Sequence, residues 1–111
     1  MSTMIEIRSY NLKPGTRADF HAQMTQAALP MLRRWGVDVV ACGPSPHDAD
    51  SYYLIRAYRS LEHRQDSQDT FYTSAEWREG PREAIVSRIE TTTSVVIRLD
   101  SAIVDAMRDA G

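Results

Sequence analysis

Apolar and polar residues alternate along four short segments of the chain, and this period of two is typical of β-strands. The first segment, residues 4–12 (MIEIRSYNL), places Ile5 and Ile7 on one side and polar neighbours on the other. The other segments are short and rich in β-branched or aromatic residues, which favour strands. These three further strands are expected at residues 37–43, 51–58 and 91–99.

Between the first two strands, apolar residues recur at three- and four-residue steps, which is the spacing of an amphipathic helix. We expect this helix over residues 16–35, after a Pro-Gly turn. Pro30 lies inside it and has no amide hydrogen, so it should bend the helix without ending it. An interrupted helical region is expected over residues 61–87, and a terminal helix over about residues 100–110.

The order strand, helix, strand, strand, helix, strand predicts an α+β protein with the ferredoxin-like βαββαβ topology and one four-stranded antiparallel sheet. A short internal repeat agrees with this doubled unit, because IRSY at residues 7–10 matches IRAY at residues 55–58. The length of 111 residues suits one domain. We therefore expect a single domain over residues 1–111.

Both helical regions of this topology lie on one face of the sheet, so the parity of the strand positions decides which side chains they cover. The odd positions are the more apolar, and we expect them to face the helices: Ile5, Ile7, Tyr53, Ile55, Ala57, Val95, Ile97 and Leu99. The even positions mix apolar and charged residues: Glu6, Arg8, Tyr10, Leu54, Arg56, Tyr58, Val96 and Arg98. Such a face is an aggregation hazard on a monomer, so we expect a second copy to cover it, sheet to sheet.

Composition narrows the classes of function. The chain has 13 basic and 15 acidic residues, a net charge of -2 and no basic tract, which argues against a nucleic-acid partner. It has no apolar run of the length that a membrane span needs. The single cysteine, Cys42, and the absence of a signal-peptide pattern favour a cytoplasmic location. His21, His47 and His63 lack metal-ligand spacing, so we expect no metal and no cofactor.

Four segments carry a family pattern that extends from Ile5 to Leu99: IEIRSYNLKPGTRADF, ALPMLRRWG, LIRAYRSLEHR and SAEW. Together they resemble the NIPSNAP family. NIPSNAP proteins belong to the dimeric α+β barrel superfamily, so the resemblance implies a homodimer whose two sheets form a barrel, with ligand or active sites inside or beside it. The superfamily includes cofactor-free quinone-forming monooxygenases, haem-degrading enzymes, isomerases and polyketide cyclases. NIPSNAP members mostly lack an established activity, and the segment from Asp100 to Gly111 departs from their pattern.

Polar side chains of the even face would meet in the cavity between the two sheets. There, arginines can hold a carboxylate or enolate oxygen, a tyrosine can donate to a carbonyl, and a glutamate can move a proton if burial raises its pKa. The catalytic candidates are Glu6, Tyr10 and Tyr58. The ligand-binding candidates are Arg8, Leu54, Arg56, Trp77 and Arg98. The alternative is structural: the glutamate and the arginines pair with one another or across the dimer.

The sequence agrees equally well with two functions. One is a cofactor-free enzyme of monooxygenase, isomerase or cyclase type that acts on a small aromatic or polyketide-like carbonyl or acid compound. The other is a non-catalytic dimer that binds a small molecule or is associated with stress. The pattern does not separate them, because a cavity has the same lining whether it turns over its guest or only holds it. A third alternative is haem binding through His63, in the first turn of the second helical region.

Overall fold

The computed structural model describes residues 1–109 and contains one four-stranded antiparallel sheet in the order β2-β3-β1-β4. Its strands are β1 (Ser2–Leu12), β2 (Asp38–Pro44), β3 (Ser51–Tyr58) and β4 (Ile89–Asp100). Each is within a few residues of its predicted position. β1 and β3 lie at the centre and pair with each other over eight residues, from Met4 opposite Tyr58 to Asn11 opposite Ser51. The ferredoxin-like α+β topology predicted from the sequence is confirmed.

The first helical segment is continuous from α1 (Arg17–Gln23) through the π-helix η1 (Met24–Ala28) to α2 (Leu29–Arg34). The π-turn lies directly before Pro30, where the missing proline N–H removes one hydrogen bond of a regular α-helix. The Leu29 N–H instead donates to the Met24 carbonyl, five residues back. The bend expected at the proline is therefore accommodated by a local widening of the helix.

The second helical region is divided into α3 (Leu61–Tyr72), α4 (Ala75–Glu79) and α5 (Arg82–Val86). Two serines begin the first two of these helices. The hydroxyl of Ser60 accepts from the His63 N–H at 3.0 Å, and that of Ser74 accepts from the Trp77 N–H at 3.2 Å. These caps satisfy amides that have no partner within the helix.

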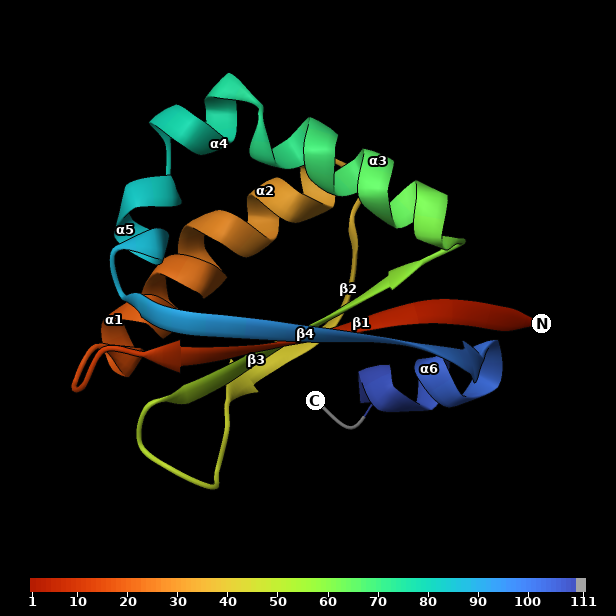
Figure 1. Ribbon diagram of the computed structural model, residues 1–111, viewed down its shortest axis with the longest axis horizontal. Helices are drawn as coiled ribbons and strands as arrows, with labels where there is room; N and C mark the ends of the chain where they lie inside the picture. Colours follow the sequence, from red (N-terminus) through yellow and green to blue (C-terminus); the bar gives the residue numbers. More distant parts are fainter. Residues whose placement is uncertain (110–111) are drawn as a thin grey trace.

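Helices cover the two faces of the sheet unequally (Figure 1). The segments α1 to α5 lie over one face, and the terminal helix α6 (Ser101–Asp109) lies under part of the other. The described part of α6 agrees with the predicted terminal helix, of which residue 110 lies outside the described residues.

The assignment of the two faces from the sequence is wrong, because the even positions of the strands face α1 to α5. Tyr10 and Tyr52 pack there against Phe20, with ring centroids 5.3 and 4.9 Å away. Large even side chains fill the space under the helices, and Glu6, Arg8 and Arg56 form hydrogen bonds with polar residues of α3. The main core is formed by residues including Tyr10, Leu12, Phe20, Met24, Leu32, Tyr52, Leu54, Phe71 and Trp77.

The odd positions form a second, smaller core with α6. Its buried members are Ile5 and Ala57, Val104 of α6, and Val40, which faces this side because the register of β2 shifts between Val39 and Ala41. Further along the same face the cover ends, and Val95 and Ile97 remain 52% and 37% exposed. Among residues 1–109, no helix has the length and apolar character needed to cross a membrane.

Candidate functional site

A cavity of about 270 Å³ lies between the even face of the sheet and the helices of the same chain. Its walls are mainly apolar and come from β1, β3, β4, η1 and the segments α2 to α5. Among the lining residues are Arg8, Tyr10, Leu54, Tyr72 and Trp77. The even-face residues were expected to line a cavity between the sheets of two copies. This expectation is corrected: they line a cavity within one chain, because the even face packs against the helices.

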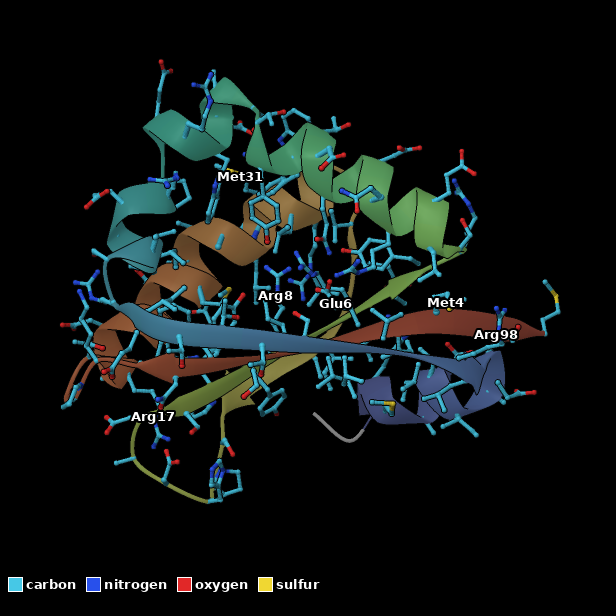
Figure 2. All side chains as sticks on the ribbon, in the orientation of Figure 1. Met4, Glu6, Arg8, Arg17, Met31 and Arg98 are labelled. Carbon is cyan, nitrogen blue, oxygen red and sulfur yellow. The ribbon has the colours of Figure 1, made fainter. Side chains whose placement is uncertain are left out.

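The polar end of the cavity is formed by Arg8, which reaches from the centre of the sheet toward α3. Figure 2 shows Arg8 and Glu6 in the layer between the strands and the helices. The Arg8 guanidinium donates to the Ser94 hydroxyl at 3.3 Å, the Tyr72 hydroxyl at 3.4 Å and the Gln68 side-chain oxygen at 3.5 Å. All three bonds lie at or beyond the long end of the usual range.

Behind Arg8, the fully buried carboxylate of Glu6 is surrounded by donors. Arg56 donates to Oε1 through Nε at 3.1 Å and Nη2 at 2.5 Å. Oε2 accepts from Arg64 Nε at 2.7 Å and from Gln68 Nε2 at 2.6 Å. We call Glu6, Arg56, Arg64 and Gln68 the carboxylate cluster.

Glu6 remains ionised in this cluster. Burial raises the pKa of Glu6, but the charge and hydrogen bonds of Arg56, with help from Arg8 and Gln68, outweigh burial and lower it to about 2. The proton-transfer role considered from the sequence requires a raised pKa, so the observed direction opposes it. The contacts match the structural alternative, in which Glu6 and the arginines pair.

The two tyrosines proposed as catalytic residues have different positions. Tyr10 lines the cavity, and burial, with Tyr72 adding to it, raises the pKa of Tyr10 to about 12, so its hydroxyl is protonated at neutral pH. Tyr58 lies outside the cavity lining, and its hydroxyl accepts from Gln68 Nε2 at 3.3 Å. Tyr10 therefore places a protonated hydroxyl in the cavity lining, whereas Tyr58 contacts the carboxylate cluster.

Of the predicted ligand-binding residues, the structure brings Arg8, Leu54 and Trp77 to the cavity. Arg56 lies behind them in the carboxylate cluster, with its Nη1 donating to the Tyr72 hydroxyl at 2.8 Å. Arg98 is remote: it is exposed near the amino terminus, where it donates to the Ser2 hydroxyl at 3.5 Å (Figure 2).

The contacts of His63 do not favour haem binding. Its Nδ1 accepts from the Arg59 N–H at 3.0 Å, so the neutral ring carries its proton on Nε2. A haem-ligating histidine needs a free lone pair on the nitrogen that meets the iron and usually donates from the other. Among the described residues, no group of three histidine, cysteine or acidic side chains is placed to hold a metal ion.

Three polar residues of this region were not predicted from the sequence: Arg64, Gln68 and Tyr72. They follow one another at four-residue steps on α3 and so lie on one face of the helix. That face points at the sheet, since all three contact residues of β1 or β3. The signal was the polarity of the segment LEHRQDSQDTFY, which has too few apolar residues for a helix that packs on an apolar core.

A model of the NIPSNAP family matches residues 5–100 of the chain. A NIPSNAP family protein of unknown function from Agrobacterium tumefaciens has a similar structure, with a TM-score of 0.81 and 18% identity over 87% of each chain. An uncharacterized NIPSNAP domain protein from Burkholderia xenovorans has a TM-score of 0.73 and 21% identity, covering 85% of this chain and 91% of that one.

The similarity extends to a protein from Bordetella bronchiseptica described as a "putative antibiotic biosynthesis monooxygenase", with a TM-score of 0.64 and 24% identity. That match covers 90% of this chain and 97% of the other. No curated protein sequence matches. At these identities the structural likeness concerns the fold alone.

Proposed function

We propose that this chain, which belongs to the NIPSNAP family, binds a small aromatic or polyketide-like carbonyl or acid compound in the cavity between its sheet and its helices. The observation that carries the proposal is that mainly apolar walls also contain the polar side chains of Arg8, Tyr10 and Tyr72, of which Arg8 donates to the Tyr72 hydroxyl. Such a lining buries an apolar body and orients one polar group. The cavity volume of about 270 Å³ lies near the lower end of the range found for small-molecule pockets.

Binding is tested by titrating the protein with a panel of small aromatic and aliphatic acids and amides while tryptophan fluorescence is followed, since one of the two tryptophans, Trp77, lines the cavity. Because Ala28 lines the cavity, Ala28→Leu should fill part of it and weaken binding at least tenfold. Ala27→Leu, on the same helical turn but outside the lining, is the matched control. Equal affinity of the two variants would show that the guest binds elsewhere.

A catalytic role as a cofactor-free monooxygenase, isomerase or cyclase is the finer form of this proposal. The described lining residues include no carboxylate and no imidazole. Catalysis here therefore requires a guest acidic enough to lose a proton without such a base. The Arg8 guanidinium and the protonated Tyr10 hydroxyl would then stabilise the resulting enolate or phenolate oxygen.

Catalysis and simple binding differ in one measurement. Oxygen uptake or product formation, followed with each compound that binds and without added cofactor, identifies an enzyme. Tyr10→Phe should then lower turnover more than it lowers affinity. A guest that binds and stays unchanged supports the alternative, a non-catalytic or stress-associated binding protein.

We also propose that the chain forms a homodimer through the odd face of the sheet, opposite to the face expected from the sequence. This face exposes Val95 and Ile97, and the odd positions of β1, of β3 and of β4 from residue 91 onward carry no charged side chain. Two copies can therefore meet there without burying like charges.

The proposed location of the protein is the cytoplasm, where a single cysteine stays reduced.

A further inference from the structure

We infer that the guest of the cavity is a carboxylic acid bound as its anion, with the carboxylate held by Arg8 and Tyr72. This inference rests on the proposed binding function and narrows its ligand class from carbonyl or acid compounds to acids. It follows from the charges around Glu6, the bonds that each arginine forms, and the position of Arg8 at the polar end of the cavity.

The first observation is an excess of positive charge. Arg8, Arg56 and Arg64 each have a nitrogen within salt-bridge distance of Glu6, at 3.6, 2.5 and 2.6 Å. Three guanidinium groups thus share one carboxylate in a largely buried region. Because buried charges are costly when they are not balanced, the region favours a further anion.

The second observation is that the hydrogen-bond acceptor positions of the Glu6 carboxylate are already occupied. Its two oxygens accept from Arg56, Arg64 and Gln68 at 3.1 Å or less, which uses the lone pairs that a carboxylate offers. Arg8 stands outside this shell, with every contact at 3.3 Å or more. Among the three arginines around Glu6, Arg8 is therefore the one whose guanidinium forms the longest polar contacts.

The third observation is that Arg8 and Tyr72 both line the cavity. The Tyr72 hydroxyl oxygen accepts from Arg56 at 2.8 Å and from Arg8 at 3.4 Å, so both of its lone pairs are engaged and its own O–H is left to donate. A carboxylate at this end can accept from the planar fork of Arg8 and from Tyr72. An uncharged amide or ketone gains less from the same donors.

The test compares acids with their amides, which have nearly the same shape and no charge. Wild-type protein is titrated at pH 7 with benzoate and benzamide, phenylacetate and phenylacetamide, and octanoate and octanamide. We expect at least one acid to bind about tenfold to a hundredfold more tightly than its amide, the usual worth of a hydrogen bond to a charged group. Arg8→Met should abolish that preference, whereas Arg98→Met, at an exposed arginine far from the cavity, should keep it.

The outcomes distinguish the carboxylate inference from the binding proposal on which it rests. Amides that bind as tightly as the acids overturn the carboxylate assignment but leave a small-molecule cavity in place. Failure of every compound to bind contradicts both. Equal losses in the Arg8 and Arg98 variants would mean that unspecific attraction to arginines, and not binding in the cavity, produces the preference for acids. If Arg8→Met does not fold, Ala28→Leu takes its place: an acid held in the cavity should bind at least tenfold more weakly to Ala28→Leu and equally well to Arg98→Met.

Discussion

At the scale of single residues, Glu6 is fully buried and yet ionised, because three arginines and Gln68 compensate the cost of burial. Folding lowers the pKa of Glu6 from 4.5 to about 2. A group whose pKa falls on folding stabilises the native state above its unfolded pKa and loses that effect as the pH falls toward its native pKa. The structure therefore predicts a loss of about 3 kcal/mol from this residue between roughly pH 5 and pH 2.

The matched variant is Glu6→Gln, which keeps the shape and removes the charge. It leaves buried guanidinium groups without their counter-ion, so the free energy of unfolding at pH 7 should fall by about 3 to 5 kcal/mol. The gap between wild type and variant, measured in denaturant melts, should shrink as the pH falls to 2. If the variant does not fold, the NMR titration of the Glu6 carboxyl carbon decides: a midpoint at pH 4 or above contradicts the prediction.

At the scale of elements, the helical segment from α1 to α2 stabilises the fold mainly through side chains that are buried against the even face of the sheet. Leu32 is 3% exposed within the main core, whereas Leu61, at the start of α3, is 57% exposed. Leu32→Ala should therefore lower the free energy of unfolding by about 2 to 5 kcal/mol through lost burial and the cavity left behind. Leu61→Ala is the control and should cost well under 1 kcal/mol; equal costs in denaturant melts would refute this packing.

The terminal helix α6 stabilises the opposite face, with Val104 buried against the odd side of the sheet and Ile103 exposed beside it. A bidentate ion pair between Arg108 and Asp38, at 2.6 and 2.8 Å, fastens the helix to β2. Val104→Asp should bury an unpaired charge and cost several kcal/mol, while Ile103→Asp should leave the thermal melt almost unchanged. A harmless Val104→Asp would mean that α6 does not pack on the sheet in solution.

At the scale of the whole molecule, the exposed part of the odd face predicts the mode of assembly. Val95→Asp should convert the proposed homodimer to a folded monomer, because the charge is solvated in the monomer but buried between two sheets. Sedimentation at micromolar concentration, with circular dichroism to confirm folding, measures this. Leu61→Asp, at an exposed leucine on α3, should remain dimeric. A wild-type protein that is monomeric under the same conditions would contradict the proposed homodimer.

Local patterns in the sequence were sufficient for the elements and their order. Alternation located the strands, three- and four-residue spacing located the helix before residue 36, and the interrupted helical region expected from residue 61 begins there as α3. These signals act within a few residues of chain, which is why they can be read without a fold. The NIPSNAP resemblance had the same origin, and the family model confirms it over residues 5–100.

Period-two alternation also placed Arg8, Tyr10 and Leu54 on a common face, and that grouping is what the structure shows at the cavity. The sequence by itself therefore determined which strand residues lie together. It did not determine which face of the sheet packs against the helices. Both faces carry apolar residues, and alternation shows only which residues share a face. Only tertiary packing decided this: the large aromatic side chains fill the space under the helices, and the polar row Arg64, Gln68 and Tyr72 on α3 compensates the charges of Glu6 and Arg56. Those partners are about 60 residues away from Glu6 along the chain, so no local pattern contains the pairing that turned the charged face inward.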